Sequence, residues 1–559
     1  MNLYADLLFT GRRIYTADPT YPWCEAVAVR GNRILAVGQT TELAELRGPQ
    51  TEVIALGDRL LLPGFTESHI HLIELALRAG QVNATAAPSA AAVAARVAER
   101  VVSRPAGGWI RGGGWDANLW AVGERPHRAL LDAVTGNVPV ALDSKDLHSM
   151  WLNSAALRHV GIRTATPDVH GGVIERDAHG EPTGVLRDNA INLIRATLPQ
   201  PDLAETTTAV RAAIPALWRS GLSAIHNASD TLDGLALRTC QALRGTGDLG
   251  LRVLQQMPAG NLSHARTLGL RSGLGDPWLR IGGIKIFADG ALGSRTALML
   301  EPYAGEPDNR GVATTAAEEL LAQALDASAA GLSLTIHAIG DRANRDVLDV
   351  LAEVRRREIA DCRLRIADCP GQQPNPKSEI RNPKSVLRHR IEHVQCIHPD
   401  DLPRLAQLGV IASVQPIHAT SDMALVDCHW GSLRARSAYP FRSLLASGAR
   451  LIFGSDGPVE PHAPLIGIHA AVTRRRSDGT PGPEGWQSQE RVTVTEAVDA
   501  YTCWPAYAAG EESYRGRIRP GYVADLAVLS QDIFTIDPMA ILETRVEMTV
   551  VDGKIRWSG

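Results

Sequence analysis

The feature that most constrains the fold of this chain is a repeated alternation of short apolar β runs with helical stretches rich in Ala, Leu and Arg. Helix-like segments such as residues 318–329 separate most of the β runs. Eight candidate strands are visible, and they end near Ser68, Asn227, Met257, Phe287, His337, His393, Gln415 and Asp456. Eight βα units of this kind predict an α/β protein built on a distorted TIM (β/α)8 barrel.

Both ends of the chain depart from this pattern and have the character of β structure. Residues 26–29 and 33–37 flank the turn Arg30-Gly31-Asn32, which is a hairpin signal. Near the other end, residues 523–529 and 548–551 are rich in β formers. Neither segment can bury a core alone. We therefore expect residues 1–59 and 508–559 to form one small β-sandwich domain beside a barrel over residues 60–507.

Two segments do not fit the barrel pattern. Residues 138–143 are a ninth β candidate, which we place in an excursion over about residues 80–198 that is rich in Gly, Trp and turn signals. A tandem Asn-Pro-Lys-Ser repeat at residues 375–378 and 382–385 is compositionally foreign to the rest of the chain. The repeat predicts a surface insertion over about residues 367–386 with no catalytic role.

Composition narrows the possible partners. The 57 Lys and Arg residues are outnumbered by 61 Asp and Glu residues, so no basic excess points to nucleic acid. Gly, Pro or charge interrupts the longest apolar runs, which argues against a membrane span. The seven Cys are dispersed, and the first residues lack the basic and apolar regions of a signal peptide. We expect a cytoplasmic protein with reduced thiols and with neither a nucleic-acid nor a membrane partner.

Four histidines and one aspartate stand at predicted strand ends. His69 and His71 are two residues apart on one strand, so their side chains point the same way. His337, His393 and Asp456 each close another apolar run. A lone strand-end histidine is more often structural, but five such residues on four strands are hard to explain by packing. Imidazole and carboxylate are ligands that Zn²⁺ prefers, and the strand ends form the active-site rim of a barrel, so a metal site is predicted.

Lys285 is a sixth candidate ligand. It is one of only five lysines in the chain and lies within the apolar run of residues 281–287. Burial of an unpaired ammonium group is costly, so such a lysine usually has altered chemistry. It could be an amine nucleophile, or a carbamate that bridges two metal ions. The alternative is an ion pair with an internal carboxylate.

With their surroundings, these residues resemble the metal-dependent amidohydrolase superfamily, and most closely its amidohydrolase-3 branch, the group of N-substituted formamide deformylase. The matching stretches run almost end to end in the family's order, and they cover residues 63–71, 148–154, 285–295, 337–344, 390–393 and 454–456. One departure is Glu67, because the family usually has Asp two residues before the first metal-binding histidine.

The resemblance implies hydrolysis of a non-peptide C–N bond, of the amide or N-substituted formamide type, by metal-activated water. Asp456 would act as general base and then as general acid. The implied cofactor is a divalent metal, expected to be two Zn²⁺ ions bridged by carboxylated Lys285. The resemblance also implies a small-molecule substrate and suggests a homodimer. The implied metal ligands are His69, His71, Lys285, His337, His393 and Asp456.

The same stretches supply candidates for substrate binding, each with a structural alternative. The candidates are Trp115, His148, Asp289 and Arg295. Trp115 could instead pack the excursion, His148 could cap the helix that starts near Asn153, and Arg295 could form an ion pair within its loop. Glu392 precedes His393 on the same strand, so it is expected to point away from the barrel interior, without a role at the metal.

Three other functions are also compatible with the sequence. A mononuclear-metal deaminase of the same superfamily would hold one ion instead of two. A barrel enzyme that uses Lys285 as a Schiff-base nucleophile would be trapped by borohydride with a carbonyl substrate. A metal-free binding or regulatory protein that has kept the fold of an enzyme would retain no metal after dialysis.

Overall fold

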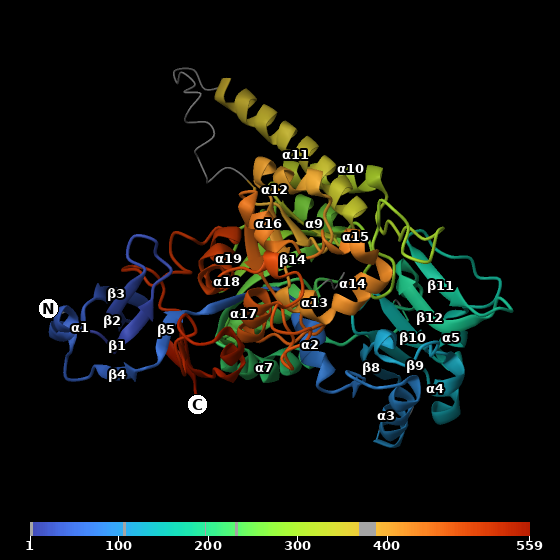
Figure 1. The fold of residues 1–559 in the computed structure, drawn as a ribbon, viewed down its shortest axis with the longest axis horizontal. Helices are drawn as coiled ribbons and strands as arrows, with labels where there is room; N and C mark the ends of the chain where they lie inside the picture. The colour runs from blue at the N-terminus through green and yellow to red at the C-terminus, as the bar shows by residue number, and fades with distance from the viewer. Residues whose placement is uncertain (1–3, 104–107, 196, 230–232, 368–386) are drawn as a thin grey trace.

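An eight-stranded parallel sheet has the strand order β19-β18-β17-β16-β15-β14-β13-β6. It lies at the centre of the molecule, where Figure 1 labels β14. The computed structural model describes residues 4–103, 108–195, 197–229, 233–367 and 387–559. The strands of this sheet are β6 (Phe65–Ile70), β13 (Leu222–Asn227), β14 (Arg252–Pro258), β15 (Leu279–Phe287), β16 (Ser333–Ala338), β17 (Arg390–His393), β18 (Ile411–Val414) and β19 (Arg450–Phe453). Asp456 N donates to His69 O at 2.8 Å, and His71 N donates to Gly457 O at 2.8 Å, which closes the barrel. The predicted barrel is confirmed.

Helices cover the outside of the barrel. They form because apolar residues recur at helical spacing, as at the buried Leu320, Ala324 and Ala327 of α10. The helices around the barrel are α2 (Leu72–Arg78), α7 (Leu203–Arg219), α8 (Leu235–Thr246), α9 (Leu262–Thr267), α10 (Ala317–Ala329), α11 (Asp341–Ala367), α12 (Leu402–Leu408), α16 (Phe441–Ala446), α17 (Pro464–Thr473), α18 (Val494–Tyr501) and α19 (Cys503–Ala508). Three short helices follow β18, namely α13 (Pro416–Ser421), α14 (Met423–His429) and α15 (Gly431–Ala435).

Strands from both ends of the chain form one mixed sheet, as predicted. Its order is β22-β21-β20-β5-β1-β2-β3, with β4 beside β1. The strands are β1 (Leu7–Tyr15), β2 (Trp23–Arg30), β3 (Arg33–Gly38), β4 (Glu52–Gly57), β5 (Leu60–Pro63), β20 (Leu526–Leu529), β21 (Val546–Val551) and β22 (Lys554–Ser558). The predicted hairpin is present, because Arg30 pairs with Arg33 across its turn. Buried Arg252 of β14 binds Asp525 at 2.6 Å and Asp552 at 2.9 Å, which ties this sheet to the barrel.

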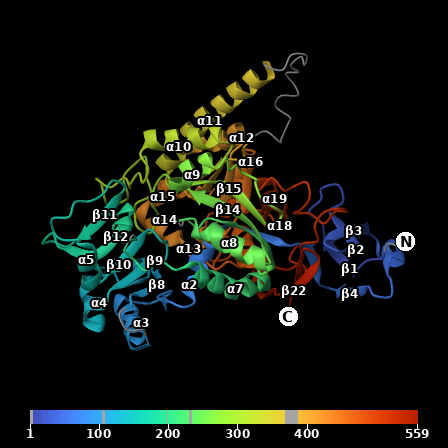
Figure 2. The ribbon, with the colours of Figure 1, turned by 180° about the vertical axis from the view of Figure 1, so that it is seen from behind.

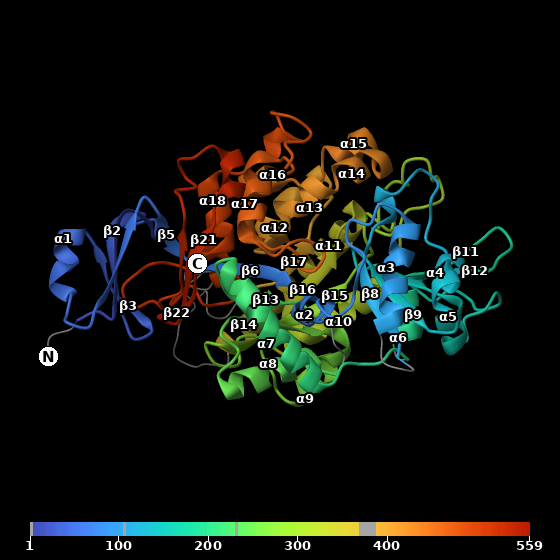
Figure 3. The ribbon, with the colours of Figure 1, turned by 90° about the horizontal axis from the view of Figure 1, so that it is seen from below.

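A third, six-stranded sheet lies between β6 and β13 in the sequence, in the order β11-β12-β10-β9-β8-β7. It lies at the opposite end of the molecule from the N-terminal strands (Figures 2 and 3). The ninth candidate strand, at residues 138–143, corresponds to β9. The strands are β7 (Val82–Asn83), β8 (Ile110–Trp115), β9 (Val140–Ser144), β10 (Ser149–Leu152), β11 (Gly172–Arg176) and β12 (Pro182–Asp188), and the helices with them are α3 (Ala90–Ser103), α4 (Arg128–Thr135), α5 (Ser154–Val160) and α6 (Asn192–Arg195).

Three further expectations concern the chain as a whole. Apart from residue 367, the insertion predicted over about residues 367–386 lies outside the described residues. Within the described ranges, Cys24, Cys240, Cys396, Cys428 and Cys503 are free thiols. None of the helices in the described part of the chain combines the length and the apolarity that a membrane span requires.

Candidate metal centre

Six side chains from five distant segments of the sequence meet at the carboxyl ends of the barrel strands. The ring centroids of His337 and His393 are 4.5 Å apart, and those of His69 and His393 are 5.0 Å apart. The His71 ring lies 5.4 Å from that of His69. Lys285 Nζ lies 3.4 Å from His69 Nε2. Of this set, His69, His393 and Asp456 offer ligand atoms that all lie within 4.8 Å of one another, which makes them a candidate metal site.

In His69 and His393, the hydrogen bond made by Nδ1 leaves Nε2 as the nitrogen that can bind a metal. His69 Nδ1 lies 2.5 Å from Glu392 Oε2, and His393 Nδ1 lies 2.8 Å from Gln415 Oε1. Both partners are acceptors, so each Nδ1 carries the hydrogen and each Nε2 presents a lone pair. Metal-binding histidines almost always donate their second N–H in this way.

The buried Oδ1 atom of Asp456 gives an independent test of whether these residues fit a metal ion. Asp456 Oδ1 has no hydrogen-bond partner. It lies 3.3 Å from His69 Nε2 and 3.1 Å from His71 Nε2. Nε2 of His69 presents a lone pair, and an anionic oxygen that faces such a lone pair is repelled unless a cation lies between them. The donor set of imidazoles and one carboxylate therefore fits Zn²⁺ or a similar ion.

His337 completes this part of the site from β16. Its Nε2 lies 3.0 Å from Gly290 O, a carbonyl that can only accept, so Nδ1 presents the lone pair. Burial and nearby positive charge hold the pKa values of His337 and His393 well below their usual range. Both rings therefore stay neutral at neutral pH, which is the protonation state that a metal ligand needs.

The left-handed backbone conformation of two residues and a close approach at one glycine position these side chains. His393 and Asp456 have positive φ values of 76° and 61°, which is uncommon for residues with a Cβ and is tolerated where the surroundings fix it. Glu67 lies beside both segments and accepts hydrogen bonds from His69 N at 3.0 Å and Ser455 N at 2.8 Å. A Cβ on Gly454 would lie 2.6 Å from the Glu67 carboxylate, so this close approach requires glycine. Burial raises the pKa of Glu67 to about 8.

The expectation that Glu392 points away from the barrel interior is wrong. Its side chain is fully buried, and besides binding His69 it forms an ion pair with Arg390 Nε at 2.6 Å. The alternation of side chains along a strand fails here, because His393 at the end of β17 adopts a left-handed conformation. Burial alone would raise the pKa of Glu392, but the positive charge of Arg390 outweighs it and holds the pKa well below its usual range. Glu392 is therefore an ionised partner of His69.

We predict that Glu392→Gln weakens metal binding by about 10- to 100-fold, because His69 loses an anionic hydrogen-bond acceptor. Metal affinity measured by competition with a chromogenic chelator tests this prediction. Glu353→Gln is the control, because Glu353 pairs with Arg356 and Arg357 on the outside of α11. Equal affinity in Glu392→Gln and in the wild type would contradict the role of Glu392.

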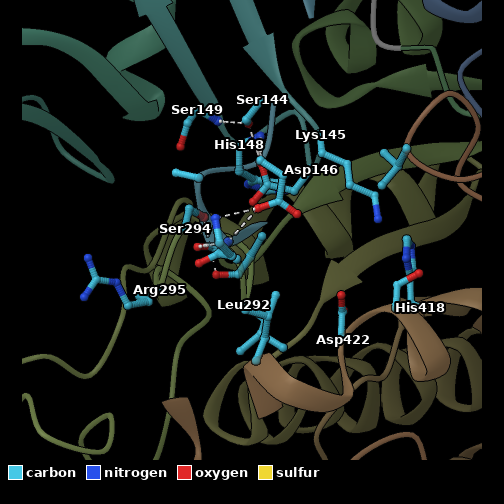
Figure 4. A pocket seen from close by; sticks show the side chains of 18 of the residues that line it. Ser144, Lys145, Asp146, His148, Ser149, Leu292, Ser294, Arg295, His418 and Asp422 are labelled. Atoms are coloured by element: carbon cyan, nitrogen blue, oxygen red, sulfur yellow. Dashed lines mark hydrogen bonds between the residues drawn. The ribbon is translucent and has the colours of Figure 1, made fainter. Parts of the chain in front are cut away.

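A cavity of about 240 Å³ opens above the cluster, and His337, His393 and Asp456 lie in its wall. The opposite wall comes from the six-stranded sheet and includes Ser144, Lys145, Asp146 and His148 (Figure 4). Helices α13 and α14 supply the side with His418 and Asp422 (Figure 4). The cavity is therefore shared between the barrel and the sheet inserted into it.

The four candidate substrate residues have different surroundings. Trp115 lines the cavity, although its indole N–H donates to Leu142 O at 2.8 Å. Arg295 also lines the cavity and forms an ion pair with Glu306 of its own loop. Asp289 is fully buried outside the cavity lining, where its carboxylate accepts hydrogen bonds from the backbone N–H groups of residues 298, 339 and 340.

His148 lines the cavity and does not cap the following helix. Its Nδ1 lies 2.7 Å from Asp188 Oδ1. The cap of α5 is Asn153, whose side chain accepts from Ala156 N.

Sequence reasoning missed three polar residues at this site. His418 Nε2 lies 3.6 Å from Asp456 Oδ2, and Gln415 binds His393. Gln415 directly follows β18, where the sequence already predicts a strand end, so its position was predictable although its contact with His393 was not. His418 lies four residues beyond that strand, in α13, and no strand-end pattern points to it. The third is Asp188, the partner of His148. It belongs to the inserted sheet, and no barrel pattern in the sequence points to it.

Comparisons with known proteins agree with this geometry. A model of the amidohydrolase family matches residues 52–556. The protein LONG AFTER FAR-RED 3 of Arabidopsis thaliana is 34% identical over 99% of this chain and 91% of its own length. The N-substituted formamide deformylase of Arthrobacter pascens is 29% identical over 100% of this chain and 99% of its own length. The crystal structure of an uncharacterized metal-dependent hydrolase from Pyrococcus horikoshii OT3 superposes with a TM-score of 0.73, at 25% identity, over 95% of this chain and 99% of that one.

Proposed function

Because this chain belongs to the amidohydrolase family, we propose that it hydrolyses the non-peptide C–N bond of an N-substituted formamide or a closely related amide. The observation that carries the proposal is the buried meeting of four imidazoles, Lys285 and Asp456 beside one cavity, whose wall includes His337, His393 and Asp456. The likeness to the formamide deformylase over the full length of both chains supports the choice of substrate class.

A bound divalent ion would polarise the substrate carbonyl and acidify the attacking water. His69, His71, His337 and His393 would hold two such ions, which we take to be Zn²⁺. Lys285 would lie between them as a carbamate formed with CO₂. The 3.4 Å contact between Lys285 Nζ and His69 Nε2 supports this place for the lysine.

Asp456 would carry the proton during hydrolysis. Its carboxylate accepts one proton from the attacking water and delivers it to the nitrogen of the substrate. The C–N bond then breaks, and the products are formic acid, or another carboxylic acid, and an amine. Asp456 suits this transfer because it lies in the cavity wall and its Oδ1 has no hydrogen-bond partner.

Metal analysis of the purified chain, followed by a screen of N-substituted formamides and N-acyl amines with detection of the amine, tests the proposal. We expect about two ions per chain, release of amine from formamides, and loss of activity with a chelator that added Zn²⁺ restores. One ion per chain together with deamination of a ring would favour the mononuclear deaminase. A chain that is active without metal and is trapped by borohydride would support Schiff-base chemistry.

A further inference from the structure

A second histidine–carboxylate pair stands over the candidate metal centre, and it comes from the inserted sheet. His148 Nδ1 lies 2.7 Å from Asp188 Oδ1. Only 1% of the Asp188 side chain is exposed, whereas 15% of the His148 side chain is exposed and lines the cavity. The His148 ring centroid is 5.1 Å from that of His337. The pair therefore joins the inserted sheet to the rim of the metal centre, and Figure 4 shows its histidine, His148, among the residues that line the cavity.

The backbone around this pair is built to hold it. Strands β10 and β12 are antiparallel, and Asp188 N donates to His148 O at 2.9 Å, so the two residues face each other across the sheet. Asp146 Oδ1 accepts from His148 N at 3.1 Å. Leu147 and Asp188 have positive φ values of 62° and 48°. Strained residues of this kind persist where the surrounding structure fixes them, and they cluster at functional sites.

The partners of the imidazole decide which of its atoms is left for a ligand. An ionised carboxylate can only accept, so Asp188 places a hydrogen on Nδ1 of His148. Nε2 is then the ring atom available to a molecule in the cavity. In serine hydrolases a buried aspartate fixes the tautomer and the orientation of a catalytic histidine in the same way.

We propose that His148 is a catalytic residue that hydrogen-bonds the scissile amide through Nε2, and that Asp188 is a positioning residue that acts through His148. This inference rests on the proposed hydrolysis and adds a group from outside the barrel to it. The hydrogen bond aligns the amide between the cavity wall and the metal centre, and loss of alignment lowers the rate of the chemical step.

A double-mutant cycle on kcat/KM with N-benzylformamide tests the pair. We expect His148→Ala to lower kcat/KM by about 10²-fold and Asp188→Asn by about 10-fold, as for removal of one oriented hydrogen-bonding group. His148→Gln should recover part of the loss, because its amide reaches the position of Nε2. The double variant should be no slower than His148→Ala, because Asp188 acts only through His148. Independent, multiplying losses would overturn the positioning role, and unchanged kcat/KM in His148→Ala would overturn the whole proposal.

Controls separate this role from folding and from metal loss. His179 lies exposed in the turn between β11 and β12 of the same sheet, so His179→Ala should behave as the wild type. Metal content and Tm should be the same in all these variants. A variant that loses metal would assign His148 to the metal centre and would contradict the proposal.

A measurement without turnover distinguishes failure of this inference from failure of the proposed function. In ¹⁵N-histidine NMR of the metal-loaded protein, His148 should carry its hydrogen on Nδ1, and sodium formate should shift its Nε2 signal. Asp188→Asn should shift the Nδ1 signal. If the wild type hydrolyses no formamide, the proposed function fails. The NMR signals then still test whether Asp188 fixes the tautomer of His148 and whether Nε2 binds a ligand. A hydrogen on Nε2 with a bare Nδ1 would overturn the proposed pair.

Discussion

Replacement of Asp456 by Asn is expected to lower kcat by about 10²- to 10⁴-fold, which is the range for loss of a general acid–base group. Asparagine has nearly the same shape as aspartate, but it cannot take up the proton of the attacking water at neutral pH. The four imidazoles remain in the variant, so it should still bind metal. Steady-state kinetics together with metal analysis of the same sample measure both effects.

The control for this variant is Asp346→Asn, because Asp346 pairs with Arg342 on the surface of α11. It should leave kcat unchanged. Near-normal turnover in Asp456→Asn would exclude Asp456 as the group that moves the proton. Complete loss of metal would show instead that Asp456 acts chiefly as a ligand.

Replacement of Lys285 by Ala is expected to remove the bridge between the two metal positions and to lower activity by about 10²-fold or more, a larger loss than for an outer partner of a ligand. The side chain is buried at 2% exposure, so the substitution leaves a space beside His69. A short carboxylate such as acetate could fill this space, and we expect it to restore part of the metal content and the activity. In the wild type, ¹³C-labelled bicarbonate should give a carbamate signal in NMR that Lys285→Ala lacks.

Lys554→Ala is the matched control, because Lys554 is exposed in β22 at the far end of the chain. It should keep the carbamate signal, the metal content and the activity. If Lys285→Ala kept two ions and full activity, the bridging model would be wrong.

The barrel and most of the metal centre could be predicted from the sequence for one physical reason. Parallel barrel strands bury both faces and end at one rim, so apolar runs that end in His or Asp identify residues that must meet there. The meeting of His69, His337 and His393 at one rim follows from this rule alone. The composite sheet was equally predictable, because two β-rich ends that cannot bury a core alone have to pair.

The direction of the Glu392 side chain could not be predicted in this way. Period-2 alternation places it on the outside of the barrel, but a left-handed backbone at His393 turns both side chains inward. Sequence patterns do not reveal a positive φ at a residue with a Cβ, because it persists only through the packing and hydrogen bonds around it. The tautomers of His69 and His393 could not be predicted either. They depend on hydrogen bonds with Glu392 and Gln415, and only the folded chain brings these residues together.

The sequence by itself determined which elements form and which ligand-type residues stand at the ends of the barrel strands, because hydrophobic periodicity and chain order are local properties. Only the tertiary structure decided how the site is completed. It brought the inserted sheet over the barrel mouth, placed His148 against Asp188 above His337, and set Glu392 behind His69. These contacts join segments tens to hundreds of residues apart, and their geometry is fixed by packing and charge pairing that no local pattern encodes.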